Sequence, residues 1–354
     1  MDDTLKSLPV WTPPGDRAVD FDTAVDLRLR SLAWTRRMLI SGVVSQVVLA
    51  VFVLLPGDPW YGAGVGLLVF ALFTLGRLVL FQLRWGRWMG AARTILGVVT
   101  ARRVTAEVIT WKGQNVVLSL DGGQSRVRVG SVHPTVRAVI ARTGEVWLAG
   151  PDERGIAFVF ANGLPVPLHA KVITEAPAPR TPEPPPPASM LVADDALPLA
   201  YARRLAAIQG AQLAALLVFA AAAITWGGPT HSLRIAYGVF IGLIVISGFV
   251  RLAPTLRLPA LFKDGRWQSF QARTNTWTGD PKPTGALGVT ITLPDGTELP
   301  AVIKIAPAEL VANIVETGLI WINGTPMLED TRAVGLPGHP IAAAAKFVRH
   351  PKLH

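Results

Sequence analysis

The sequence predicts a polytopic α-helical membrane protein, in which four transmembrane helices form two hairpins and carry two small, strand-rich α+β modules in the cytoplasm. Three observations favour this fold class. The chain contains four long apolar runs, one pattern of elements occurs twice, and only 16% of its 354 residues are charged whereas 50% are hydrophobic. Because about a quarter of the residues in an average soluble domain are charged, the composition favours the membrane class.

The first transmembrane hairpin is predicted within residues 36–82. Its apolar runs are Met38–Leu55 and Trp60–Phe81, and Pro56-Gly57-Asp58-Pro59 separates them. A helix needs about 20 apolar residues to cross the hydrocarbon core, so each run is long enough for one span. A polar N-terminal segment, residues 1–35, precedes the first run. We expect this segment to be partly disordered and cytoplasmic.

The second hairpin is predicted within residues 199–251. Leu205–Trp226 carries no charge, Gly227-Gly228-Pro229 ends it, and the fourth run follows at residues 235–250. Between the hairpins, residues 175–198 are rich in proline, which favours an extended polyproline II spacer. The alternative is that this segment is a ligand for a proline-recognising domain.

The distribution of Lys and Arg predicts the orientation. Basic residues lie just before the first helix and just after the second helix of each hairpin, whereas the two hairpin tips hold a single arginine, Arg234. Because short cytoplasmic loops carry the excess of Lys and Arg, both termini and the middle of the chain are expected in the cytoplasm. The abundance of Arg, Ala, Gly and Pro is typical of a GC-rich bacterium. The predicted location is therefore the bacterial inner (plasma) membrane, as a multi-pass protein.

The second half of the chain repeats the first, which indicates an internal tandem duplication. Thr143-Gly144 and Trp147 return as Thr317-Gly318 and Trp321. Further pairs match in the same order. They are Tyr61-Gly62 with Tyr237-Gly238, Arg77 with Arg251, and Asp121-Gly122 with Asp295-Gly296. Four matches in one order are not expected by chance.

Each copy of the repeat ends in a strand-rich module, predicted at residues 83–174 and at residues 252–354 with a basic tail. Alternating strands are expected at Val104–Thr110 and Val116–Leu120, with a hairpin turn after the second. A helix is clearest at Pro307–Glu316, where proline starts it and Gly318 follows its end. The expected order is β-β-β-α-β-β, which suits either a small open sheet or a barrel.

The sequence contains no recognisable catalytic or metal-binding pattern. It has no cysteine, which excludes disulfides, thiolate metal sites and cysteine nucleophiles. Its six histidines lack the spacing of a metal site. Asp121 and Asp295 lie beside glycine in predicted turns, where aspartate is favoured for its turn geometry. We therefore predict no enzyme activity, no cofactor and no metal.

Two sets of residues are candidates for specific roles. Gly62 and Gly66, and Gly238 and Gly242, are small residues four apart at equivalent repeat positions, and such pairs let helices pack closely. The other set consists of Trp147 and Trp321 in matching strands. Each is predicted either in the core of its module or as the centre of a partner-binding face.

The predicted function is that of a non-enzymatic integral membrane scaffold or adaptor, which presents its duplicated modules to a protein partner. The alternatives are a component of a transporter or channel, and a membrane enzyme without a recognisable motif. The expected partners are the lipid bilayer and a cytoplasmic protein, with a homo-oligomer left open. The net charge of +10 is accounted for by the orientation, so no nucleic-acid partner is expected.

Overall fold

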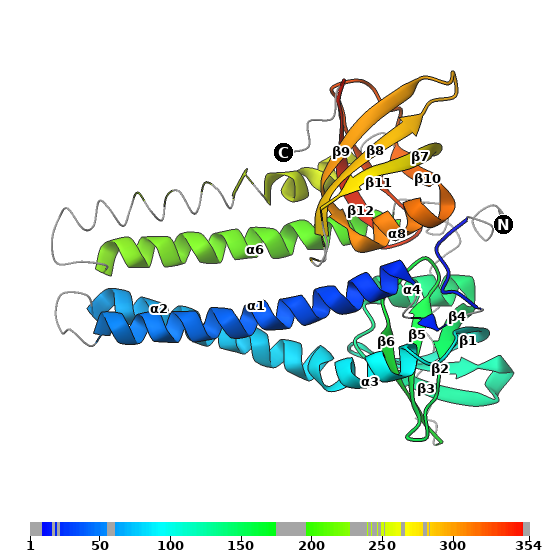
Figure 1. Ribbon diagram of the computed structural model, residues 1–354, viewed down its shortest axis with the longest axis horizontal. Coiled ribbons are helices and arrows are strands. Elements are labelled where there is room, and N and C mark those ends of the chain that lie inside the picture. The colour runs from blue at the N-terminus through cyan, green and yellow to red at the C-terminus, as the bar shows by residue number, and fades with distance from the viewer. Residues whose placement is uncertain are drawn as a thin grey trace. The chain divides into compact units, whose positions relative to one another are not determined.

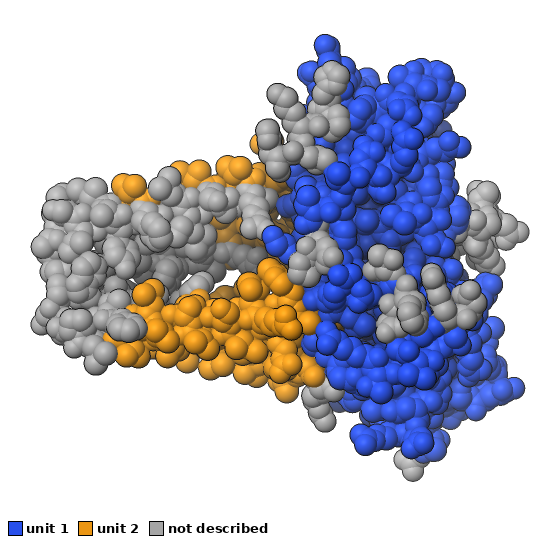
Figure 2. All heavy atoms as spheres, viewed as in Figure 1, with its two compact units in different colours: residues 1–31, 87–203, 258–354 blue, residues 32–86, 204–257 orange. Residues whose placement is uncertain are grey.

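The computed structural model describes residues 9–15, 18–19, 22–54, 61–174, 196–226, 239, 242, 246, 249–250, 252–262, 266–278, 282 and 284–349. The chain divides into two compact units, coloured separately in Figure 2. The barrel unit comprises residues 1–31, 87–203 and 258–354, and the helical unit comprises residues 32–86 and 204–257. Both strand-rich modules belong to the barrel unit.

The first module is a closed barrel of six antiparallel strands (Figure 1). Its strands pair in the order β1-β2-β3-β6-β5-β4, and β1 pairs with β4 to close the barrel. The helix α4 (Pro134–Thr143) connects β3 to β4. The strands are β1 (Arg102–Lys112), β2 (Asn115–Leu120), β3 (Ser125–Val129), β4 (Glu145–Ala149), β5 (Ile156–Ala161) and β6 (Leu168–Val172).

The second module has the same architecture. Its six strands pair in the order β7-β8-β9-β12-β11-β10, with β7 closing on β10. The helix α8 (Ala308–Thr317) again connects the third strand to the fourth. The strands are β7 (Trp267–Trp277), β8 (Thr284–Thr292), β9 (Glu298–Pro307), β10 (Leu319–Asn323), β11 (Thr331–Gly335) and β12 (Ala342–Phe347).

The two barrels agree in detail as well as in topology. The first strand of each carries a β-bulge at the same place, between Val108 and Thr110 in β1 and between Thr274 and Thr276 in β7. Each helix ends at a glycine with φ of 65°, Gly144 or Gly318, a left-handed conformation that suits glycine. This repetition fits the tandem duplication predicted from the sequence.

The modules differ from the expected element order by one strand each. The sixth strands, β6 and β12, were not predicted, and they complete the closure of the two barrels. β12 has the sequence Ala-Ala-Ala-Ala-Lys-Phe, and alanine has little preference for strands. Of the two alternatives, open sheet and barrel, the structure shows closed barrels.

Long helices make up the described part of the helical unit. α1 (Thr23–Leu54) and α6 (Ala196–Trp226) each begin in the barrel unit and continue into the helical unit. α2 (Tyr61–Phe81) ends in a turn of π-helix, Gln82–Gly86, before α3 (Arg87–Leu96). Residues 252–257 are helical, and a 3₁₀ turn follows at Leu258–Leu261.

The prediction of a polytopic helical membrane protein is wrong. None of the helices in the described ranges combines the length and the apolar character that crossing a bilayer requires. The predicted inner-membrane location and multi-pass topology depended on those spans and are contradicted with them.

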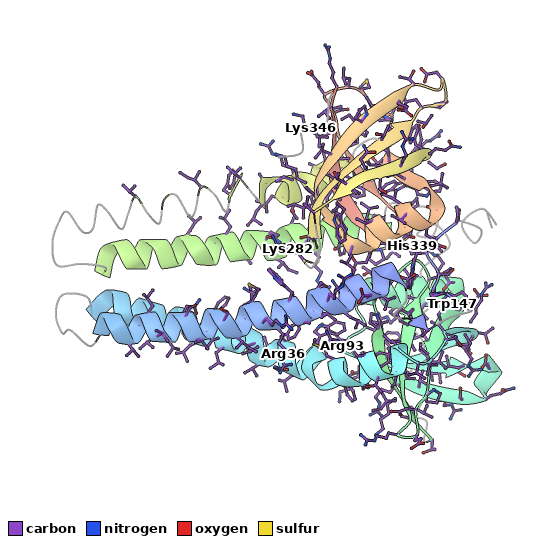
Figure 3. The ribbon with its side chains drawn as sticks, viewed as in Figure 1. Arg36, Arg93, Trp147, Lys282, His339 and Lys346 are labelled. Atoms are coloured by element: carbon purple, nitrogen blue, oxygen red, sulfur yellow. The ribbon has the colours of Figure 1, made fainter. Side chains whose placement is uncertain are left out.

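The physical reason lies in the bounds of the helices. Two of the apolar runs are only the later parts of longer helices, because α1 includes Arg36, which Figure 3 labels, and Arg37, and α6 includes Arg203 and Arg204. The prediction had placed these arginines outside the spans. The length of an apolar run nominates a span but does not establish one.

Candidate functional site

The two barrels meet through the same loop of each. The β5–β6 loop contains Gly163-Leu164-Pro165-Val166-Pro167, and the β11–β12 loop contains Gly335-Leu336-Pro337-Gly338-His339-Pro340. A Cβ atom added to Gly163 would lie 3.0 Å from Cδ2 of His339 and 3.2 Å from Cδ2 of Leu336. Gly163 also has φ of 73°. The site therefore needs glycine both for its backbone conformation and for the close approach of the second loop.

An N-terminal strap, which we define as residues 9–15, is built into this junction. Trp11 is only 1% exposed. Its backbone N–H donates to Oδ1 of Asn313 at 2.9 Å, and its carbonyl oxygen accepts from the N–H of Gly163 at 3.1 Å. Nδ2 of Asn313 donates to the carbonyl oxygen of Gly163 at 2.9 Å. One buried network thus joins the strap, α8 and the first barrel.

The strap is also fastened to the start of α1. Nε1 of Trp11 donates to Oδ2 of Asp22 at 3.1 Å, while Oδ1 of Asp22 accepts from the N–H groups of Ala24 and Val25. Asp22 is therefore the capping residue of α1, in the position where a carboxylate stabilises a helix. These bonds tie Trp11 of the strap to the first turn of α1.

His339 is buried at the junction, with 3% of its surface exposed (Figure 3). Its Nδ1 lies 2.9 Å from the carbonyl oxygen of Pro337. Burial lowers the pKa of His339 from 6.5 to about 4, and the Arg142 guanidinium acts in the same direction. The ring is therefore neutral at neutral pH and serves as a packing residue between the barrels.

Beside the strap lies a cavity of about 340 Å³, which we call the α8 cavity. It is lined by the strap, the start of α1, the end of β7 and one face of α8. Its volume falls within the range of small-ligand sites. Its walls include Trp277, Val311, Val315, Glu316, Asp22 and Trp11.

The α8 cavity has an acidic and aromatic character. Two of its lining side chains are carboxylates, Asp22 and Glu316, and two are tryptophans. None of the described residues that line it is Lys, Arg or His. Carboxylates and indole faces both attract cations. The chemistry of this lining therefore favours a positively charged group.

No family model, curated protein or solved structure matches the chain. The geometry of the site must therefore support the functional argument by itself. In the described part of the chain, no three His, Asp or Glu side chains come together in a way that could hold a metal ion.

The structure describes only part of the surroundings of the glycines predicted to pack helices. Gly62 and Gly66 lie in α2, but the surroundings of their Cα atoms are not described. Gly238 lies outside the described residues. Gly242 is described as helical, and no described atom lies within 4 Å of the position that a Cβ would take there. The packing role of these glycines stays a prediction.

Trp147 and Trp321 occupy equivalent places on the outer faces of the barrels. In β4, the neighbours of Trp147, Val146 and Leu148, point into the barrel and are buried, whereas Trp147 is half-buried. It packs against an outer cluster of buried residues that includes Trp11. Trp321 is half-buried in the same pattern. The alternation in the sequence predicts that each tryptophan and its two apolar neighbours lie on opposite faces of the strand. The burial pattern of β4 and β10 agrees with this alternation.

Sequence reasoning missed Asn313, His339 and the strap. A signal for Asn313 was present in the repeat, because both helices end at an equivalent glycine and Asn313 then matches the buried Val139 of α4. A polar residue that replaces a core valine in one copy indicates a contact that the other copy lacks. The loop motif with Gly-Leu-Pro also occurs in both copies and could have identified the junction.

Proposed function

We propose that the protein is a non-enzymatic adaptor, whose two barrels form one platform that binds a protein partner. The observation that carries this proposal is the junction network of Trp11, Asn313 and Gly163. The backbone N–H of Trp11, the side-chain amide of Asn313 and the backbone groups of Gly163 are hydrogen-bonded to one another, and such satisfied networks select a single arrangement of the parts that they join. The membrane part of the sequence-based hypothesis is not carried forward.

The role of Asn313 supports an architectural purpose for this network. Its side chain makes three hydrogen bonds, with the N–H of Trp11, with the carbonyl oxygen of Gly163 and with the carbonyl oxygen of Glu309. All three partners are backbone groups. The side chain therefore holds segments of the chain together, and its polar atoms are occupied by these contacts.

The face of α8 beside the cavity supports a binding role. Val315 lies at the edge of the α8 cavity and is 66% exposed. An exposed apolar side chain beside a concave, partly apolar surface offers a partner apolar area to bury on binding. The proposed docking face therefore consists of the α8 cavity and its edge at Val315.

Site-directed cross-linking tests the proposal, because the chain has no cysteine of its own. A Val315→Cys variant of the full chain, labelled with a photoreactive benzophenone, would be incubated with extract from the source cells. Met327→Cys is the matched control, because Met327 is also exposed (57%) in the second barrel but does not line the cavity.

We expect one discrete cross-linked protein from position 315 that position 327 does not yield. Excess unlabelled wild-type chain should suppress this product by competition. Equal products from both positions, or none from position 315, would contradict the proposed docking face.

A further inference from the structure

The tandem repeat allows the α8 cavity to be compared with the same place in the first barrel. Trp277 and Trp111 are equivalent, because each follows the threonine at which the bulge ends. Trp111 pairs with Val116 of β2, and Trp277 pairs with Leu287 of β8. The two indole rings therefore extend from matching positions in the two barrels.

In the first barrel, an arginine from the neighbouring helix covers the indole ring. The Cζ atom of Arg137 lies 4.1 Å from the centre of the Trp111 ring, which is the geometry of a cation–π contact. Arg137 is the fourth residue of α4. The first barrel thus contains a guanidinium site that its own chain fills.

In the second barrel, this arginine is replaced by a much shorter side chain. The fourth residue of α8 is Val311, and both Val311 and Trp277 line the α8 cavity. A valine ends close to the helix, so it leaves open the space that the longer arginine side chain fills in the first barrel. The cavity is therefore the second barrel's counterpart of the Arg137 position.

The charges around the cavity also differ between the copies, in the direction that suits a cation. Glu316 lies where the first copy has Arg142, counted back from Gly318 and Gly144. Glu316 also lies in the last turn of α8, where the helix dipole places partial negative charge. Asp22 adds a second carboxylate. In the described residues, Glu316 forms no ion pair that would neutralise it.

We propose that the α8 cavity binds the side chain of an arginine supplied by a partner protein, with its guanidinium stacked on Trp277 and paired with Glu316. This inference rests on the proposed function and names the chemistry of the partner. Arg137 on Trp111 is the template for the stacked geometry. The acidic lining of the α8 cavity supplies a negative charge that attracts the arginine of a separate protein. The first barrel does not need this charge, because its arginine belongs to the same chain.

The geometry favours arginine over lysine. A guanidinium is planar, stacks on an aromatic face and is more weakly hydrated than an ammonium, so it costs less to bring into a partly apolar cavity. It can also donate two hydrogen bonds to one carboxylate. Asp22 already accepts from Trp11, Ala24 and Val25, so Glu316 is the carboxylate available to form that pair.

The test uses three blocked tripeptides, acetyl-Gly-Xaa-Gly-amide with Xaa as Arg, Lys or Gln, and the full chain. Saturation-transfer NMR on the peptide side-chain protons gives the affinity of each peptide without labelling the protein. We expect saturable binding of the Arg peptide, weaker binding of the Lys peptide and no saturable binding of the Gln peptide. Equal binding of the Arg and Gln peptides, or no binding of the Arg peptide, would overturn the proposal.

Variants locate the binding site. Glu316→Gln keeps the shape of the side chain and should weaken the Arg peptide several-fold, because it removes the charge of the pair. Trp277→Leu should weaken it as well, through loss of the stacking face. The control Glu153→Gln, at an exposed glutamate of the first barrel, should leave the affinity unchanged. Equal loss in all three variants, or in none, would overturn the assignment to this cavity.

The peptide and cross-linking experiments can fail separately. A cross-linked partner whose yield does not change in Glu316→Gln and Trp277→Leu would leave the adaptor function standing and refute the arginine site. Binding of the Arg peptide at the cavity, without any partner cross-linked from position 315, would support the arginine site and refute the proposed docking face.

Discussion

The substitution Asn313→Val tests the junction most sharply, because the first copy of the repeat has Val139 at the equivalent position. Asn313 lies buried (4% exposed), and its loss removes the partners of the Trp11 N–H and of the Gly163 carbonyl oxygen. A buried polar group left without a partner costs about 1–3 kcal/mol, and the added apolar contact of valine returns about 1 kcal/mol.

With two groups left unpartnered, the expected net loss is about 1–5 kcal/mol in the free energy of unfolding. For a folded unit of this size, that corresponds to a drop in Tm of roughly 2–20 °C. Urea denaturation of the full chain measures the loss. Amide hydrogen exchange at Trp11 measures it locally, because this N–H loses its acceptor and its protection should fall.

The matched control is Asn275→Val, at an exposed asparagine of β7 whose Nδ2 donates to Oγ1 of Thr290. Its effect should stay within about 0.5 kcal/mol, as for most surface substitutions. If Asn313→Val changes stability no more than this control and the Trp11 amide stays protected, the Asn313 hydrogen bonds do not hold the junction together.

Three further predictions concern the junction and the repeat. His339 has a pKa of about 4 in the folded protein, against an unperturbed value of 6.5. The contribution of its neutral ring to the free energy of unfolding is therefore complete above pH 6.5 and falls by about 3 kcal/mol as the pH drops toward 4. Denaturation of the wild type and of His339→Gln across this pH range isolates this contribution, and parallel pH curves for the two proteins would contradict it. Gly163→Ala should lower the free energy of unfolding by about 2–4 kcal/mol, because of the positive φ and the contact of the new Cβ with His339. The control Gly113→Ala has positive φ in open space and should cost about 1 kcal/mol. Equal urea midpoints for the two variants would show that the close approach of His339 to Gly163 does not affect stability. Arg137→Ala should cost about 0.5–2 kcal/mol through loss of the contact with Trp111, and unchanged urea denaturation would show that this contact does not stabilise the first barrel.

The sequence was sufficient to predict the repeat and most strands, because these depend on local patterns. Alternation at Val104–Thr110 and the glycines after each helix are short-range signals, and the structure places β1, α4 and α8 there. The sixth strand of the second barrel was not predicted because β12 is mostly alanine, so that its pairing with β9 and β11 decides its conformation. Closure of a barrel is a long-range property that local preference does not encode.

The membrane prediction failed for a related reason. It treated apolar runs as complete elements, whereas α1 begins at Thr23 and α6 at Ala196, in charged sequence that the helices continue through. The candidate site was invisible for another reason, since Trp11, Trp277 and Glu316 are far apart in sequence. Comparing the two copies residue by residue does reveal it, because Arg137 becomes Val311 beside an equivalent tryptophan.

The most direct test of the account is to restore in the second barrel the residue that the first barrel has, with Val311→Arg. The arginine should fill the α8 cavity from within the chain, as Arg137 covers Trp111. Protection of the Trp11 amide from hydrogen exchange checks that the variant is folded. Glu316→Gln should also weaken peptide binding, but without changing the volume of the cavity. We expect Val311→Arg to abolish binding of acetyl-Gly-Arg-Gly-amide. Undiminished binding of this peptide to the folded variant would contradict it.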